Sequence, residues 1–113
     1  MTIDTANPGN DLSFMKIRTP KGTGFDYWLI NPTGNYGLDC EGGAKLGEEY
    51  LVYIGEHPTH GNSTLLTCIV REMIDRAKAG EQWTGVHVGF LARVNRHAMA
   101  MGSVSRKLEG ASA

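Results

Sequence analysis

The sequence lacks most of the features that identify a protein's role at first sight. Its 113 residues include only two cysteines, Cys40 and Cys68, which are too few for a disulfide framework. No stretch approaches the roughly 18 to 20 consecutive apolar residues of a membrane span, and the N-terminus has neither the basic nor the apolar segment of a secretion signal. These absences predict a cytoplasmic protein with reduced thiols and no membrane association.

An excess of charge of either sign is also absent. The 11 basic and 12 acidic side chains give a net charge of -1, whereas a domain that binds nucleic acid through its phosphates is usually basic. Direct binding of nucleic acid is therefore not favoured. Apolar and charged fractions of 41% and 20% are those of an ordinary globular protein, and the length suits a single domain.

The first part of the chain contains a candidate hairpin. The segment NPTG, residues 31–34, has the composition of a type I turn, and Gly34 can adopt the left-handed conformation that closes a three-residue hairpin loop. The turn predicts a hairpin of strands 25–31 and 35–40, whose side chains alternate between two faces. The expected core face carries Trp28, Ile30, Tyr36, Leu38 and Cys40, and the other face carries Phe25, Tyr27, Leu29, Gly37 and Asp39.

Two further strands complete the expected sheet. The β-branched and aromatic residues of EYLVYI predict a strand over residues 49–54, although a helix over residues 44–54 is an alternative. The preceding glycine-rich segment CEGGAKLGE predicts a loop. Residues 13–19 are a candidate edge strand, since Pro20 follows them.

Two helices are expected in the second part of the chain. Residues 63–79 place seven apolar side chains on one half of a helical wheel, and Gly80 follows as a stop. Residues 83–101 carry a second apolar stripe, which Gly85 and Gly89 weaken as a helix former.

This order of elements predicts an α+β fold, in which the helices pack on one face of a small antiparallel β-meander. The single domain would span residues 13–102. A flexible arm at residues 1–12 and a flexible tail at residues 103–113 would flank it.

Histidines and cysteines offer the only candidates for metal binding or catalysis. His57 and His60, in the loop sequence HPTH, have a spacing that could hold a metal ion with a cysteine or Glu56. Two ligands in one loop make only half a site, so surface histidines and no cofactor are the favoured interpretation. Neither Cys40 nor Cys68 lies in a paired motif, and both are interpreted as packing residues.

His87 falls within the apolar stripe of the second helix. A buried imidazole needs a hydrogen-bond partner, and its pKa is readily moved around neutral pH. Because no nucleophile and carboxylate lie at the spacing of a triad, a core histidine is favoured over a catalytic base.

The second face of the expected hairpin is the candidate binding surface. If both helices cover the Trp28 face, Phe25, Tyr27 and Leu29 are left to solvent, to the N-terminal arm or to a partner. Aromatic side chains give large contact areas in protein interfaces. Asp39, Glu48 and Glu49 would add an acidic edge to the same surface.

The order of these elements resembles a known family. FDYWLINPTGNYGL resembles the aromatic hairpin, EEYLVYI the third strand, and GNSTLLTCIVREMI the loop and helix of the ArdB/KlcA antirestriction proteins of mobile elements. The similarity covers about residues 25–79 and carries over no functional residue. The resemblance implies a small non-enzymatic protein that blunts a bacterial defence system.

The sequence therefore predicts a non-enzymatic inhibitor of antirestriction or anti-CRISPR type, which binds a host nuclease or a CRISPR or restriction complex through protein contacts. Two alternatives stay open. One is a small metal-binding or enzymatic domain that uses His57, His60 and His87. The other is a homodimeric accessory protein in which the apolar face pairs with its own copy.

Overall fold

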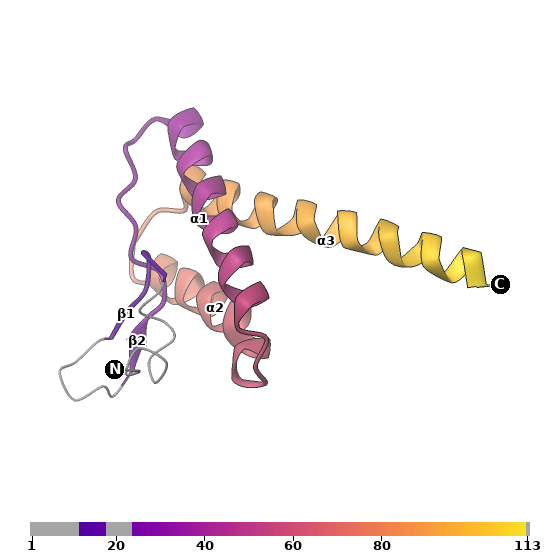
Figure 1. The fold of residues 1–113 in the computed structure, drawn as a ribbon. Coiled ribbons are helices and arrows are strands. Elements are labelled where there is room, and N and C mark those ends of the chain that lie inside the picture. The colour runs from indigo at the N-terminus through magenta and orange to yellow at the C-terminus, as the bar shows by residue number, and fades with distance from the viewer. Residues whose placement is uncertain (1–11, 18–23, 113) are drawn as a thin grey trace.

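The computed structural model describes residues 12–17 and 24–112, and most of these residues are helical (Figure 1). The described chain runs through two short paired strands and three α-helices. In order, the elements are β1 (Lys16–Ile17), β2 (Phe25–Asp26), α1 (Tyr36–Glu56), the 3-10 turn η3 (Gly61–Thr64), α2 (Leu65–Lys78) and α3 (Gly85–Ser112). The prediction of an α+β fold with a β-meander is therefore wrong.

Helix α1 occupies the region that was expected to hold two strands. Residues 35–40 and 49–54 were predicted to be β, yet both lie in one continuous helix. The Asn35 side chain begins it, because its Oδ1 accepts a hydrogen bond from the backbone N–H of Leu38 at 2.9 Å. NPTG is thus the approach to a helix and not a hairpin turn, although Gly34 does adopt a positive φ of 91°. The alternative helix over residues 44–54 was the correct interpretation.

The expected core face of the hairpin is correspondingly incomplete. Trp28 is fully buried and Ile30 is half-buried against the core. Tyr36 and Leu38 lie in the first turn of α1 and are 64% and 56% exposed. A helical turn separates neighbouring side chains by about 100°, so these residues cannot share a face with Trp28 in the way that strand alternation requires.

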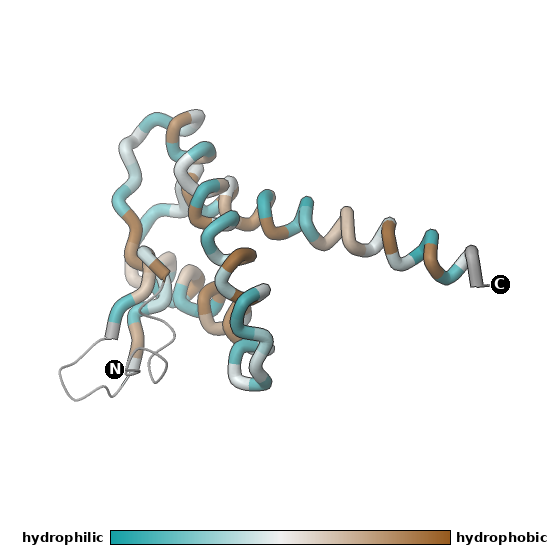
Figure 2. Tube along the Cα trace, viewed as in Figure 1, coloured by the Kyte–Doolittle hydropathy of each residue, from teal (hydrophilic) through white to brown (hydrophobic). Residues whose placement is uncertain are grey.

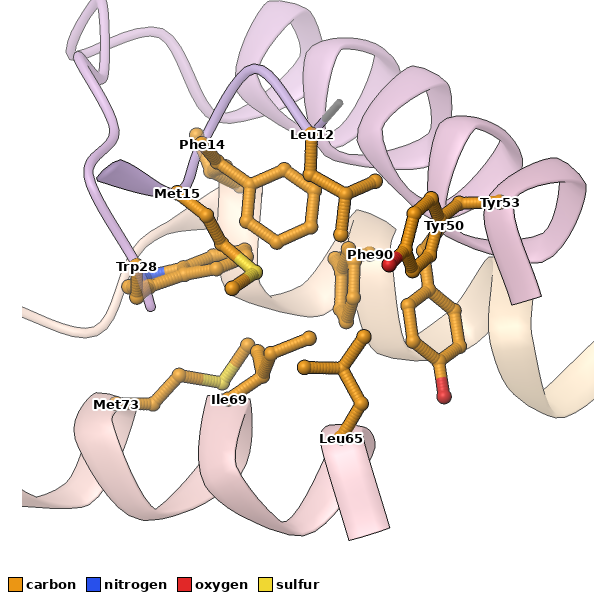
Figure 3. Close-up of a cluster of buried hydrophobic side chains, with 11 residues drawn as sticks. Leu12, Phe14, Met15, Trp28, Tyr50, Tyr53, Leu65, Ile69, Met73 and Phe90 are labelled. Carbon is orange, nitrogen blue, oxygen red and sulfur yellow. The ribbon is translucent and has the colours of Figure 1, made fainter. Parts of the chain in front are cut away.

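The core joins the N-terminal segment to all three helices (Figure 3). Phe14, Trp28 and Phe90 form a mutual edge-to-face cluster, with ring centroids 5.0 to 5.6 Å apart. Helix α2 approaches this cluster with Ile69 and Met73, both fully buried. The remaining buried apolar residues are Leu12, Met15, Tyr50, Tyr53, Leu65 and Val86.

Helices α1 and α3 cross at four glycines, and their backbones are in direct contact there. Gly43 and Gly47 on α1 lie against residues 86–93 of α3, and Gly85 and Gly89 on α3 lie against residues 36–44 of α1, each pair of glycines being four residues apart. A Cβ atom built on Gly85 would lie only 2.6 Å from the carbonyl oxygen of Tyr36. The segment CEGGAKLGE, predicted to be a loop because of its glycines, is therefore the helical surface that allows this close crossing.

The two helices expected in the second half are present, with different lengths. Helix α2 and the preceding η3 turn together match the predicted residues 63–79, and Gly80 ends α2 with a φ of 107°. Helix α3 was predicted to end near residue 101, but it continues to Ser112 through the expected flexible tail. Its distal half projects from the body of the molecule (Figure 1).

The described residues before α1 contain little regular secondary structure, but hydrogen bonds and buried side chains hold them against the rest of the protein. Lys16 pairs with Asp26 in the β1–β2 ladder, the only paired strands within residues 12–17 and 24–112. The backbone N–H of Leu29 donates to the carbonyl oxygen of Phe14 at 2.8 Å. Of the predicted edge strand 13–19, residues 16 and 17 form β1, and residues 18 and 19 lie outside the described chain. The predicted arm at residues 1–12 also lies outside it, except for the buried Leu12.

Candidate functional site

The most unusual polar group in the core is the imidazole of His87. It lies in the first turn of α3, is 2% exposed, and contacts the rings of Trp28 and Trp83, at centroid distances of 5.3 and 4.3 Å. Its Nε2 faces the indole N–H of Trp28 at 3.1 Å, and its Nδ1 faces the backbone N–H of Thr84 at 3.0 Å. The predicted location of His87 in the core is confirmed.

The hydrogen bonds of His87 are compatible only with a neutral ring. A neutral imidazole has one bare nitrogen, which can accept from either Trp28 or Thr84. When Nε2 is bare, Nδ1–H can donate to the Thr84 hydroxyl oxygen at 3.2 Å. A protonated ring carries a hydrogen on both nitrogens, so neither nitrogen could accept a hydrogen bond from the N–H groups of Trp28 and Thr84. Burial lowers the pKa of His87, while the nearby Glu81 carboxylate raises it to a smaller extent.

We expect His87 to make the protein less stable in mild acid. Because its pKa is lowered in the folded state, the unfolded chain takes up the proton first. The free energy of unfolding is then unaffected well above pH 6.5 and falls below it, by up to about 1.4 kcal/mol per pH unit. Urea unfolding at a series of pH values measures this slope. His87→Gln should flatten it, whereas His97→Gln on the exposed part of the same helix should not; equal slopes in all three proteins would contradict the assignment.

Asp39, predicted to be part of a binding surface, is buried at the start of α1. Its carboxylate accepts hydrogen bonds from the backbone N–H and the hydroxyl of Thr33, at 2.8 and 2.7 Å, and from the backbone N–H of Gly34 at 3.2 Å. These bonds, first of all the one from the Thr33 backbone, hold the pKa of Asp39 below its usual range. The carboxylate thus fastens the residues before α1 onto the helix.

Of the other predicted binding residues, Leu29 lines a hollow together with Asp39, whereas Phe25 and Tyr27 line a different one. Phe25 and Tyr27 lie together, with ring centroids 5.8 Å apart, and are half-buried against the core. Leu29 is 36% exposed. Glu49 accepts hydrogen bonds from the backbone N–H and hydroxyl of Ser13, at 2.8 and 2.7 Å. Glu48 lies on the exposed side of α1 and forms an ion pair with Arg93 of α3.

The candidate metal residues are not assembled into a cluster. His57 stacks on Tyr53 and its Nδ1 lies 3.0 Å from the Tyr53 carbonyl oxygen, and His60 lies in the exposed loop that follows. Within residues 12–17 and 24–112, no group of three or more His, Cys, Asp and Glu side chains is placed to hold a metal ion. Cys40 and Cys68 are each half-buried on different helices.

The distal half of α3 is an exposed apolar feature that the sequence prediction missed. We call residues 95–110 the α3 arm; every one of them is exposed. Apolar positions recur along it (Figure 2), and four large side chains contribute to them. These are Met99, Met101, Val104 and Leu108, which are 66%, 50%, 47% and 65% exposed.

The apolar residues of α3 continue one row from the body into the arm. We call this row the seam; its members follow one another at alternating intervals of three and four residues, as in a coiled coil. The seam consists of Leu91, Val94, Ala98, Met101, Ser105 and Leu108. The sequence contains this spacing, but residues 103–113 were predicted to be a flexible tail because most of them are small and polar. No helix of the described chain is long and apolar enough to cross a lipid bilayer.

Comparison with protein-family models, with curated proteins and with solved structures finds no match. The class of the protein is therefore defined by its own architecture: a small, mostly helical body with one projecting helix. What it does is inferred below from that architecture alone.

Proposed function

We propose that this protein is a helical binding module, whose docking element is the α3 arm, and that it acts by contact and not by chemistry. The observation that carries the proposal is the exposure of the seam. Helix α3 has 28 residues, and its residues 95–110 all lie exposed while they carry Ala98, Met101 and Leu108 in one row, with Ser105 between the last two. Exposed apolar rows of this kind mark interaction surfaces.

The stability of the arm supports the same proposal. Isolated helices of about 15 residues are marginal in water, and most helical stability in proteins comes from packing an apolar face. The arm also contains Gly102 and Gly110, and each glycine weakens a helix by about 1 kcal/mol relative to alanine. A partner that covers the seam would supply the missing packing.

The polar groups of the body favour a binding role over an enzymatic one. The ring nitrogens of His87 and the carboxylate of Asp39 bond to groups within the fold, where they hold Trp28 and the residues before α1. Their hydrogen-bonding atoms are therefore already used to stabilise the fold.

The identity of the target stays a prediction from the sequence. The resemblance to antirestriction proteins depended on an aromatic hairpin and a third strand, and α1 occupies most of that region. A nuclease or a CRISPR or restriction complex is therefore proposed only as one target class for the arm.

Site-specific photo-cross-linking in the native host tests the proposal. A benzophenone amino acid at position 101 lies in the seam, whereas the same group at position 99 lies on the opposite side of the helix. We expect a discrete heavier adduct from position 101 and little from position 99. Mass spectrometry then identifies the adduct, and the purified partner should bind wild type but not Met101→Glu. Adducts from neither position would contradict the proposal.

A further inference from the structure

We infer that the α3 arm docks on a second copy of this chain, with two arms paired antiparallel along the seam and the two bodies at opposite ends. This inference rests on the proposed function, because it names the partner of the same helix. The seam already serves as a packing surface at its inner end, where Leu91 and Val94 are half-buried against the core. The pairing would extend that packing along the arm.

The sizes of the seam residues fit a close antiparallel pair. In such a pair, the first apolar position of each heptad packs against the fourth position of the facing helix. This register places Met101 of one copy against Ala98 of the other in the two inner layers. Ser105 then lies level with Val94, whose side chain is already half-buried against its own core. A large side chain then faces a small one in each inner layer, which lets the helices approach without voids.

The charges of the arm leave its seam accessible to an identical helix. The cations Arg96, Arg106 and Lys107 all lie on the half of the helix away from the seam, at 100° per residue. The positions that flank the seam hold no lysine or arginine. They are occupied by Asn95, His97, Gly102, Val104 and Glu109. Two basic arms can therefore approach each other along this side.

The orientation of the pair depends on the helix dipoles, because the charged side chains do not decide it. Arg106 and Lys107 lie on the half of the helix away from the seam in either orientation. Opposed helix dipoles favour the antiparallel arrangement.

Light scattering coupled to size-exclusion chromatography of the full chain, over a dilution series, tests this inference. We expect wild type at twice the chain mass. Met101→Glu should give the mass of a single chain, with the dissociation constant raised at least about a hundredfold, because each dimer would contain two buried carboxylates. Met99→Glu is the matched control and should stay dimeric. Circular dichroism should show both variants folded, since both methionines are exposed.

The orientation has its own measurement. A benzophenone amino acid at position 105 of the purified protein should cross-link to the second copy near Val94, whereas a parallel pair would give adducts near position 105. Wild type at single-chain mass throughout the series, or equal dissociation of both glutamate variants, would overturn the inference. The proposed function would survive that result if position 101 still formed adducts with a different protein in the host.

Discussion

Replacing Gly89 with alanine should destroy much of the protein's stability. A Cβ atom at this position would overlap the carbonyl oxygen of Cys40 in α1, and its other close neighbours are also backbone atoms. Backbone cannot move aside as a flexible side chain can, so α1 and α3 would have to separate. We expect the free energy of unfolding to fall by about 3 kcal/mol or more, measured by urea denaturation. Gly43→Ala should behave alike, because its Cβ would overlap the Val86 carbonyl oxygen.

The neighbouring Gly42 provides the matched control. It lies in the same helix, one position from Gly43, but a Cβ atom there would have no atom of another residue within 4 Å. Gly42→Ala should therefore stabilise the protein by about 0.5 to 1 kcal/mol through helix propensity alone. If Gly42→Ala and Gly89→Ala shifted stability in the same direction, the close crossing of α1 and α3 would be refuted.

Replacing Trp28 with alanine should have a comparably large effect. The indole is fully buried, contacts the rings of Phe14 and Phe90, and donates its N–H to His87. Its removal leaves a large cavity where the N-terminal segment meets the helices. We expect the free energy of unfolding to fall by about 3 to 5 kcal/mol, which thermal denaturation measures.

Trp28→Phe separates the packing of the indole from its hydrogen bond. The smaller ring keeps much of the aromatic contact but removes the donor that opposes protonation of His87. We expect a smaller loss than for Trp28→Ala, together with a weaker dependence of stability on pH below 6.5. An unchanged acid slope in Trp28→Phe would show that the indole N–H does not influence the imidazole.

Local sequence patterns predicted α2 correctly and α1 incorrectly, for a physical reason. In α2 the buried Leu65, Ile69 and Met73 repeat at intervals of four residues, so the helical period is visible within the segment itself. The side of α1 that meets α3 is formed partly by glycines, which are poor helix formers when considered alone. Their value comes from the backbone of α3, more than 40 residues away in the chain, and a local pattern carries no information about it.

The candidate site shows the same division. The core position of His87 followed from its place in an apolar stripe, but of its two donors only Thr84 is close in the chain, whereas Trp28 is 59 residues away. The residues of the predicted binding face are divided between two hollows, because the prediction assumed strand alternation through Asp39, which is helical. The composition of NPTG fits a hairpin turn and fits the segment before a helix N-cap equally well. Only the packing of α1 against the rest of the protein distinguishes the two.

Because α3 is one continuous helix, a small change of angle at its glycine crossing with α1 produces a large displacement at the end of the α3 arm. A helix rises about 1.5 Å per residue, so the tip of the arm stands roughly 25 Å beyond the last residues that touch the body. A change of 10° in the crossing angle at Gly85 and Gly89, which lie roughly 35 Å from the tip, would therefore swing the tip by roughly 6 Å. Substitutions at the glycine crossing that change this angle would therefore move a partner bound at the tip of the α3 arm, although they alter no residue of the arm itself.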